Sequence, residues 1–94
     1  MTAIRPITKA AFRVEELVYQ FEEIDVPDGL LQTASINEVN EKYSDEHLIG
    51  EARHRLDLVE DQLNYWDAYM LGDDGPVLRR DKRQLVSFIK KWSK

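Results

Sequence analysis

The sequence contains no cysteine and no long apolar run. Without cysteine, the protein has no disulfide bond, no zinc site built on thiolates and no cysteine nucleophile, so its stability must come from packing. The first residues lack the unbroken apolar stretch of a signal peptide, and no segment approaches the roughly 20 apolar residues that span a bilayer. We therefore expect a soluble protein of the reducing cytoplasm that makes no membrane contact.

Recognisable catalytic motifs are also missing. The sequence shows no glycine-rich phosphate loop, no nucleophile elbow and no Ser/His/Asp spacing, so we do not expect an enzyme. His47, Glu51 and His54 stand at helical spacing, and Glu-x-x-His is the spacing of carboxylate-bridged di-iron bundles. Such sites need a second copy of the motif, and two histidines seven residues apart are about 10 Å apart, too far for one zinc ion. We expect neither a metal nor a cofactor.

What is present is typical of one small globular domain. The 94 residues are 43% apolar and 33% charged, which favours folding over disorder and leaves room for a single modest core. No internal repeat, low-complexity tract or flexible linker divides the chain. We expect residues 1–94 to form a single helical domain.

Apolar residues recur at spacings of three and four along most of the chain, the pattern of amphipathic helices. We predict an all-α fold, a small bundle of three main helices with one short helix. The predicted helices cover about residues 9–25, 36–43, 45–71 and 77–92. The β-favouring run LVYQF at residues 17–21 keeps a strand possible within the first of them.

Capping residues set the predicted helix ends. Thr8 can cap the first helix, Ser35 forms a capping box with Glu38, and Ser44 precedes the acidic first turn of the long helix. Pro76 suits a first helical position, where its missing N–H group costs nothing.

The predicted helix at 45–71 carries an apolar seam. At about 100° per residue, seven side chains fall within an arc of roughly 80°. They are Leu48, Ala52, Leu56, Val59, Leu63, Trp66 and Met70. The near-heptad spacing fits packing against a neighbouring helix or against a second copy, so the protein is expected to be a monomer or a homodimer.

Tyr65 and Tyr69 lie about 120° from the centre of that seam, in line with Leu58. Two interpretations are open. Another helix covers this face, and each tyrosine buries its ring while its hydroxyl reaches water. Otherwise the face is exposed and offers aromatic contact area to a protein partner.

Charge is distributed unevenly. Residues 1–76 hold 17 of the 18 acidic residues and 6 of the 13 basic ones, whereas residues 77–94 hold 7 basic residues and Asp81. The basic end can lie across the acidic body and neutralise it, or either region can meet an oppositely charged partner.

The predicted last helix has a basic side opposite its apolar stripe of Leu78, Leu85, Ile89 and Trp92. The basic residues are Arg79, Arg80, Arg83, Lys90 and Lys91. They form an ordinary solvated face or, alternatively, a surface for DNA or RNA. The low sequence pI of about 5.0 disfavours the second interpretation, because groove-reading proteins are usually basic overall.

The segments GEARHRLDLVEDQL and RRDKRQLVSFIKKW resemble small accessory proteins of prophages and plasmids, which often pair a long acidic helix with a short basic one. The resemblance implies a non-enzymatic protein that binds host machinery, as anti-CRISPR and other anti-defence proteins do, often by occluding a nucleic-acid-binding surface. It would then act in the host cytoplasm.

Our leading hypothesis is an inhibitory protein-binding module of this phage or mobile-element kind, whose partner has a basic surface. Aromatic side chains would anchor the contact and carboxylates would steer it. The predicted contact residues are Leu58, Tyr65, Tyr69, Asp57, Asp61, Asp67, Asp73 and Asp74. The alternative is a small regulatory protein that binds nucleic acid through the basic last helix.

Overall fold

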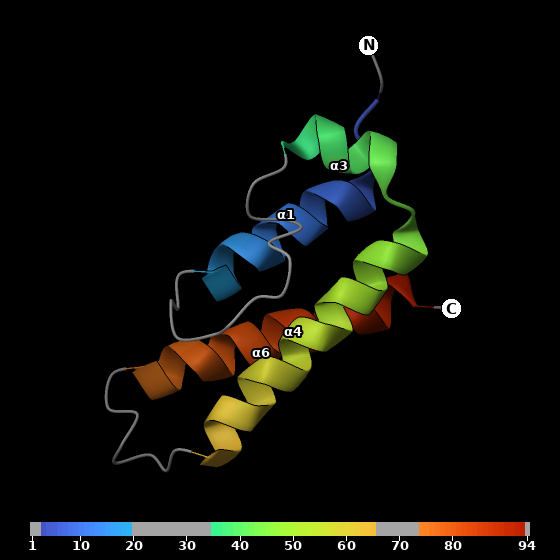
Figure 1. Ribbon diagram of the computed structural model, residues 1–94. Helices are drawn as coiled ribbons and strands as arrows, with labels where there is room; N and C mark the ends of the chain where they lie inside the picture. Colours follow the sequence, from blue (N-terminus) through green and yellow to red (C-terminus); the bar gives the residue numbers. More distant parts are fainter. Residues whose placement is uncertain (1–2, 20–34, 66–73, 94) are drawn as a thin grey trace.

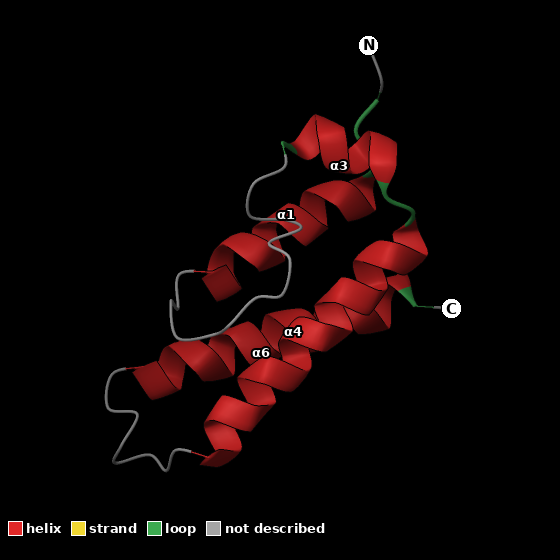
Figure 2. Cartoon of the chain, in the orientation of Figure 1, coloured by secondary structure: helices red, strands yellow, loops and turns green. Residues whose placement is uncertain are grey.

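The computed structural model describes residues 3–19, 35–65 and 74–93. These residues form four helices: α1 (Pro6–Tyr19), α3 (Ile36–Lys42), α4 (Asp45–Tyr65) and α6 (Asp74–Trp92). Within the described ranges there is no strand, as Figure 2 shows, so the predicted all-α bundle is confirmed. Residues 17–19 of the β-favouring run are helical. The predicted helix ends near residues 25 and 71 lie outside the described residues.

The three long helices pack against one another. In Figure 1, α6 runs beside α4 in the opposite direction, and α1 lies along both of them. The short α3 packs against α1 near its N-terminus. Because α1, α4 and α6 are mutual neighbours, their cross-section is a triangle, and the groove between any two helices lies opposite the outer side of the third.

Two of the predicted caps are confirmed. The Ser35 hydroxyl accepts a hydrogen bond from the N–H of Glu38 at 3.2 Å, and the Ser44 hydroxyl accepts one from the N–H of His47 at the same distance. Each serine therefore satisfies one of the N–H groups that the first turn of its helix leaves without a helical partner.

The predicted cap at Thr8 is wrong. The helix begins at Pro6, whose fixed φ and missing N–H suit a first helical position. Thr8 is instead completely buried, and its hydroxyl donates a hydrogen bond to the side-chain oxygen of Asn40 at 3.3 Å. Similarly, α6 begins at Asp74 rather than after Pro76, since a proline anywhere in the first turn removes no helical hydrogen bond.

The core combines one stripe from each long helix. The seam predicted on α4 is buried at Leu48, Ala52 and Val59 and half-buried at Leu56 and Leu63, while Trp66 and Met70 lie outside the described residues. On α1 the buried apolar residues are Ile7, Ala11, Val14 and Val18, and on α6 they are Leu78, Leu85 and Phe88. Ile89 and Trp92, which were predicted on the α6 stripe, pack at its edge.

A buried asparagine joins α3 to the start of α1. The side-chain amide of Asn40 donates to the carbonyl of Ala3 at 2.8 Å, and its oxygen accepts from the backbone N–H and the Nε of Arg5 at 3.2 and 3.0 Å. The same arginine pairs with Asp45 and donates to the carbonyl of Tyr43. These contacts fix the beginnings of α1 and α4 relative to each other.

Candidate functional site

The structure describes part of the predicted acidic and aromatic face. Asp57 and Asp61 are exposed on the outer side of α4, and Leu58 is half-buried and packs against the core. Tyr65 is the last residue of α4 and Asp74 is the first of α6, but the structure does not describe their side chains. Tyr69, Asp67 and Asp73 fall in the undescribed range 66–73, so whether another helix covers the tyrosines is not tested.

The basic residues predicted on the last helix all lie on α6. Arg79, Arg80, Arg83, Lys90 and Lys91 are all exposed on α6. Of the basic side chains on α6, Lys82 reaches an acid of another helix, with 3.8 Å between its Nζ and the Oε2 of Glu60. Within the described ranges, Arg79, Arg83, Lys90 and Lys91 have no acidic partner within ion-pair distance. Among the described residues, the ion pair of Lys82 with Glu60 is thus the one salt bridge by which a basic side chain of α6 meets an acid of another helix.

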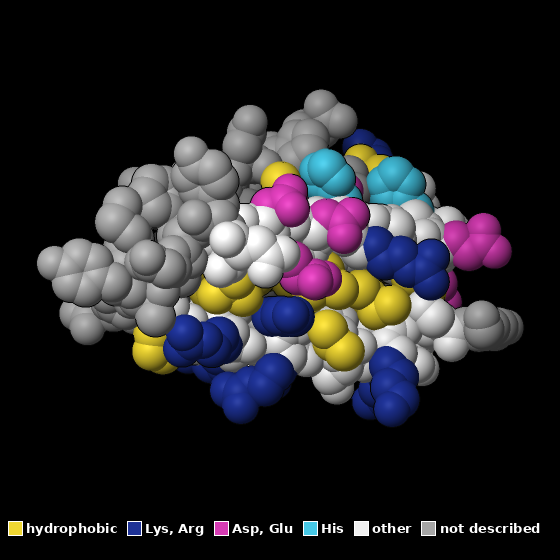
Figure 3. Space-filling model, turned by 90° about the horizontal axis from the view of Figure 1, so that it is seen from below, with side chains coloured by type: hydrophobic (Ala, Val, Ile, Leu, Met, Phe, Trp, Pro, Cys, Tyr) yellow, Lys and Arg dark blue, Asp and Glu magenta, His cyan; other side chains and the backbone are white. Residues whose placement is uncertain are grey.

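On the face of the molecule shown in Figure 3, most basic side chains lie apart from most acidic ones. In the view of Figure 3, most Lys and Arg side chains lie along one edge of the molecule, and acidic side chains and histidines lie toward the other. Apolar side chains occupy the strip between them. The described residues on this face therefore carry their charge unevenly.

A groove between α1 and α6 brings together residues that the sequence keeps far apart. We call it the basic groove. Its cationic residues are Arg13 from α1 and Arg80 and Lys91 from α6, and its volume is about 370 Å³. The other residues that line it are Ala10, Val14, Leu17, Gln84, Ser87, Phe88 and Trp92.

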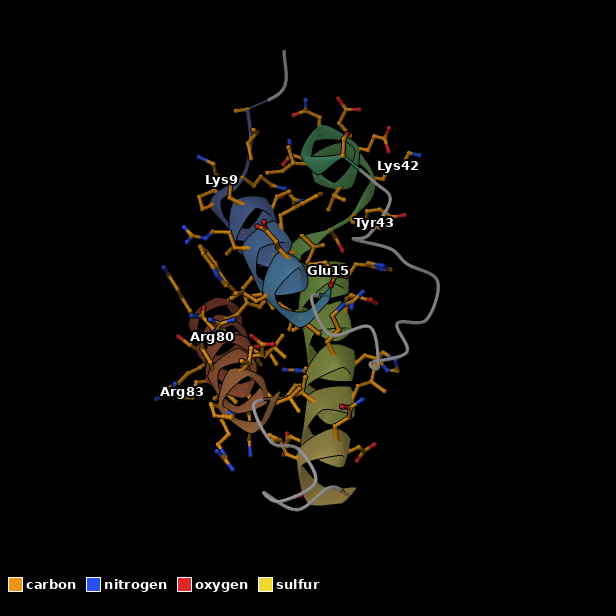
Figure 4. The ribbon with its side chains drawn as sticks, turned by 90° about the vertical axis from the view of Figure 1, so that its left-hand side faces the viewer. Lys9, Glu15, Lys42, Tyr43, Arg80 and Arg83 are labelled. Carbon is orange, nitrogen blue, oxygen red and sulfur yellow. The ribbon has the colours of Figure 1, made fainter. Side chains whose placement is uncertain are left out.

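Lys9 extends this basic surface along α1. Figure 4 shows Lys9, Arg80 and Arg83 on one side of the molecule, with Lys42 and Tyr43 on the other. Sequence reasoning missed the contribution of α1, because Lys9 and Arg13 were counted with the acidic body. Their spacing of four residues, which places both on one face of a helix, was the available signal.

An ion cluster is buried between α1 and α4. Glu15 forms a close ion pair with Arg55, and their side chains are only 3% and 1% exposed. Arg55 also bonds Glu51 through Nη2 at 3.1 Å. Burial raises the pKa of Glu15 to about 7, although Arg55 opposes the shift, and burial lowers the pKa of Arg55. Glu15 therefore lies on the buried side of α1.

A second buried acid, Asp81, lies on α6. Its side chain is completely buried, and neither of its oxygens has a hydrogen-bond partner among the described residues. Burial raises its pKa to about 6, and Arg80, whose Nη2 is 3.8 Å from Oδ1, opposes the shift. Asp81 therefore does not contribute to the charge of the exposed surface of α6.

The two histidines are exposed on α4. The ring of His47 stacks on that of Tyr43, with 4.8 Å between the ring centres and 28° between their planes. Among the described residues, no three histidine or acidic side chains converge as a metal ion would require. In the same part of the chain, no helix is both long enough and apolar enough to cross a bilayer.

Comparison with known proteins gives no information about function. No family of proteins matches the sequence, and neither curated proteins nor solved structures show significant similarity to it.

Proposed function

We propose that the protein is a non-enzymatic binding module that docks the acidic outer side of α4 on a basic surface of a partner protein. One observation carries this proposal: among the described residues, exposed acids of α4 and exposed bases of α6 lie on separate helices with a single ion pair between those helices. Asp57 and Asp61 stay exposed on α4, and the Lys82–Glu60 contact is the single ion pair between α4 and α6 among the described residues. An unneutralised acidic side is what electrostatic steering toward a basic partner needs.

The partner surface we propose is one that otherwise holds nucleic acid. Such surfaces are rich in Lys and Arg, so a folded acidic helix can compete for them with phosphate groups. This mode of action makes the protein a steric and electrostatic inhibitor. Its origin in a phage or other mobile element, and its action against host defence in the cytoplasm, rest on the resemblance of the last half of the chain to small accessory proteins.

The experiment that tests the acidic surface is charge reversal. The partner would be captured from host lysate with tagged protein, identified by mass spectrometry and purified. We expect Asp57→Lys with Asp61→Lys to weaken its binding about tenfold or more at low salt, equivalent to about 1.4 kcal/mol.

The matched control is Glu16→Lys with Glu38→Lys, which makes the same charge change at exposed sites on α1 and α3. If both double variants weaken binding equally, net charge matters and the α4 surface does not, and the site assignment fails.

Nucleic-acid binding through α6 is the competing proposal, and the added cations of α1 favour it. Lys9 and Arg13 extend the basic surface beyond one helix. It predicts binding of DNA or RNA that weakens steeply with salt and is lost when Arg79, Arg80 and Arg83 are replaced by alanine. An electrophoretic shift assay that detects no binding at low salt would exclude it.

A further inference from the structure

The basic groove has an apolar floor as well as cationic rims. Ala10, Val14 and Leu17 supply the floor from α1, and Phe88 and Trp92 supply it from α6. Ala10, Leu17 and Trp92 are each only partly buried, so covering them would remove further apolar surface from water. The ammonium of Lys91 lies 5.1 Å from the ring centre of Trp92, which keeps charge and aromatic surface together at one end of the groove.

The α6 wall of the groove is a single line of polar side chains. Arg80, Gln84, Ser87 and Lys91 follow one another at spacings of four, three and four, so they lie along one side of the helix. At 1.5 Å per residue this line is about 16 Å long. Arg13 faces it from α1 across the floor. A ligand that satisfies the whole groove is therefore elongated, apolar on one side and negatively charged along its edges.

Two kinds of macromolecule carry enough negative charge to match these cations. The phosphates of a nucleic acid would pair with Arg13, Arg80 and Lys91, and Trp92 offers a ring on which one base could stack. The α1 half of the floor is aliphatic, however, and Phe88 is buried, so most of the floor offers nothing to a nucleic acid. An amphipathic helix satisfies both features, because its apolar residues cover the floor while acids on its flanks reach the rims. A helix of about eleven residues has the length of the groove wall.

We propose that the basic groove binds an acidic amphipathic helix of a partner protein, with apolar side chains on the floor and carboxylates paired with Arg13, Arg80 and Lys91. The groove lies on the opposite side of the bundle from the outer face of α4, since α1, α4 and α6 are mutual neighbours. This second surface does not depend on the acidic one. A protein with both would bridge two partners of opposite charge.

The test uses a designed helical peptide of about 18 residues as the probe, with leucines along one face and glutamates on both flanks. One control peptide replaces every flanking glutamate by glutamine, and a second replaces the leucines by serine. A single-stranded oligonucleotide of similar charge is the third probe. Binding of each labelled probe to the full chain is followed by fluorescence anisotropy at low and at physiological salt. We expect each control peptide to bind at least tenfold more weakly than the parent peptide.

Variants of the protein then locate the site. Arg13→Glu with Lys91→Glu reverses one charge on each rim and should weaken peptide binding at least tenfold. Arg83→Glu with Lys90→Glu is the matched control, because it makes the same charge change at exposed positions of α6 outside the groove. We expect less than a twofold effect from it. Circular dichroism establishes that both variants are folded.

The proposal is overturned by any of three results. The serine peptide binds as tightly as the leucine peptide, or the oligonucleotide binds as tightly as the parent peptide, or the two protein variants weaken binding equally. A second copy of the protein is another possible occupant, and analytical sedimentation of the protein alone tests for it. If the protein is a dimer, and Arg13→Glu with Lys91→Glu makes it a monomer, then a second copy fills the groove and the proposal is overturned.

Discussion

Among the described residues, two ion pairs join α4 to side chains within α1 and α6, and they differ in their surroundings. Glu15 and Arg55, between α1 and α4, are almost completely buried, whereas Lys82 and Glu60, between α6 and α4, are 45% and 39% exposed and 3.8 Å apart. The exposed pair interacts in water, where such contacts contribute about 0–1 kcal/mol. The buried pair has lost its hydration, so each charge depends on the other. The ion pair therefore matters for how α1 packs on α4, whereas the packing of α6 on α4 depends mainly on apolar contacts.

The largest effect should follow from removing one partner of the buried pair. Arg55→Met leaves the Glu15 carboxyl buried without its arginine partner, so Glu15 must hold a proton to stay inside the protein. We expect the free energy of unfolding to fall by about 3–5 kcal/mol at neutral pH. Urea denaturation followed by circular dichroism measures it.

Replacing both partners distinguishes the contribution of the two charges to stability from that of the surrounding apolar packing. Arg55→Met with Glu15→Leu removes both buried charges and should recover most of the loss, since well-packed apolar side chains often stabilise as well as a buried pair does. If Arg55→Met alone lowers the free energy of unfolding by less than about 1 kcal/mol, the buried pair contributes no more than an exposed one. The proposed difference between the two pairs would then be wrong.

The effect of pH on stability should be smaller than the effect of Arg55→Met. Its sign should be opposite to that produced by acids whose pKa falls on folding. The pKa of Glu15 rises from 4.5 to about 7 on folding and that of Asp81 from 3.8 to about 6. Between these limits the folded protein holds protons that the unfolded chain has released, so raising the pH through this window lowers stability. Each group contributes a slope of at most about 1.4 kcal/mol per pH unit.

Thermal unfolding between pH 5 and pH 8 measures this dependence, with the midpoint expected to be higher at the acidic end. Glu15→Gln and Asp81→Asn should each flatten the profile, because an amide does not titrate. Glu16→Gln, an exposed neighbour on α1, is the control and should leave the profile unchanged. A wild-type midpoint that rises from pH 5 to pH 8 would show that neither buried acid keeps its proton.

The smallest effect should come from the exposed pair. Lys82→Ala removes the contact with Glu60 and is expected to change the free energy of unfolding by less than about 1 kcal/mol, with no effect in high salt. Urea denaturation at low and high salt provides the measurement. A loss as large as that of Arg55→Met would mean that the exposed pair, too, is shielded from water.

The helices were predictable because their signals are local. Ser35 and Ser44 cap the helices that follow them, as a hydroxyl close to the free N–H groups of a first turn should. The apolar seam of α4 was also predictable over residues 48–63, because helical periodicity places its members on one side. Thr8 was assigned wrongly because Pro6, two residues earlier, is better suited to the first position.

The buried ion cluster could not be predicted from residue type, which assigns charged side chains to the surface. A positional signal was present. Glu15 lies four residues after Ala11 and three before Val18, both buried, and Arg55 lies about 20° from Leu48 on the helical wheel. The basic groove was out of reach for a different reason. Its two walls are more than 60 residues apart in the chain, and only the packing of α1 on α6 brings Arg13 opposite Lys91.

The most direct test of the proposed function is carbodiimide cross-linking of the protein to its captured partner, because this reagent joins carboxylates to amines in contact. We predict cross-links from Asp57 or Asp61 of α4 to lysines of the partner, located by mass spectrometry of the digested complex. Cross-links that involve only lysines of this protein, with none from these two acids, would contradict the account.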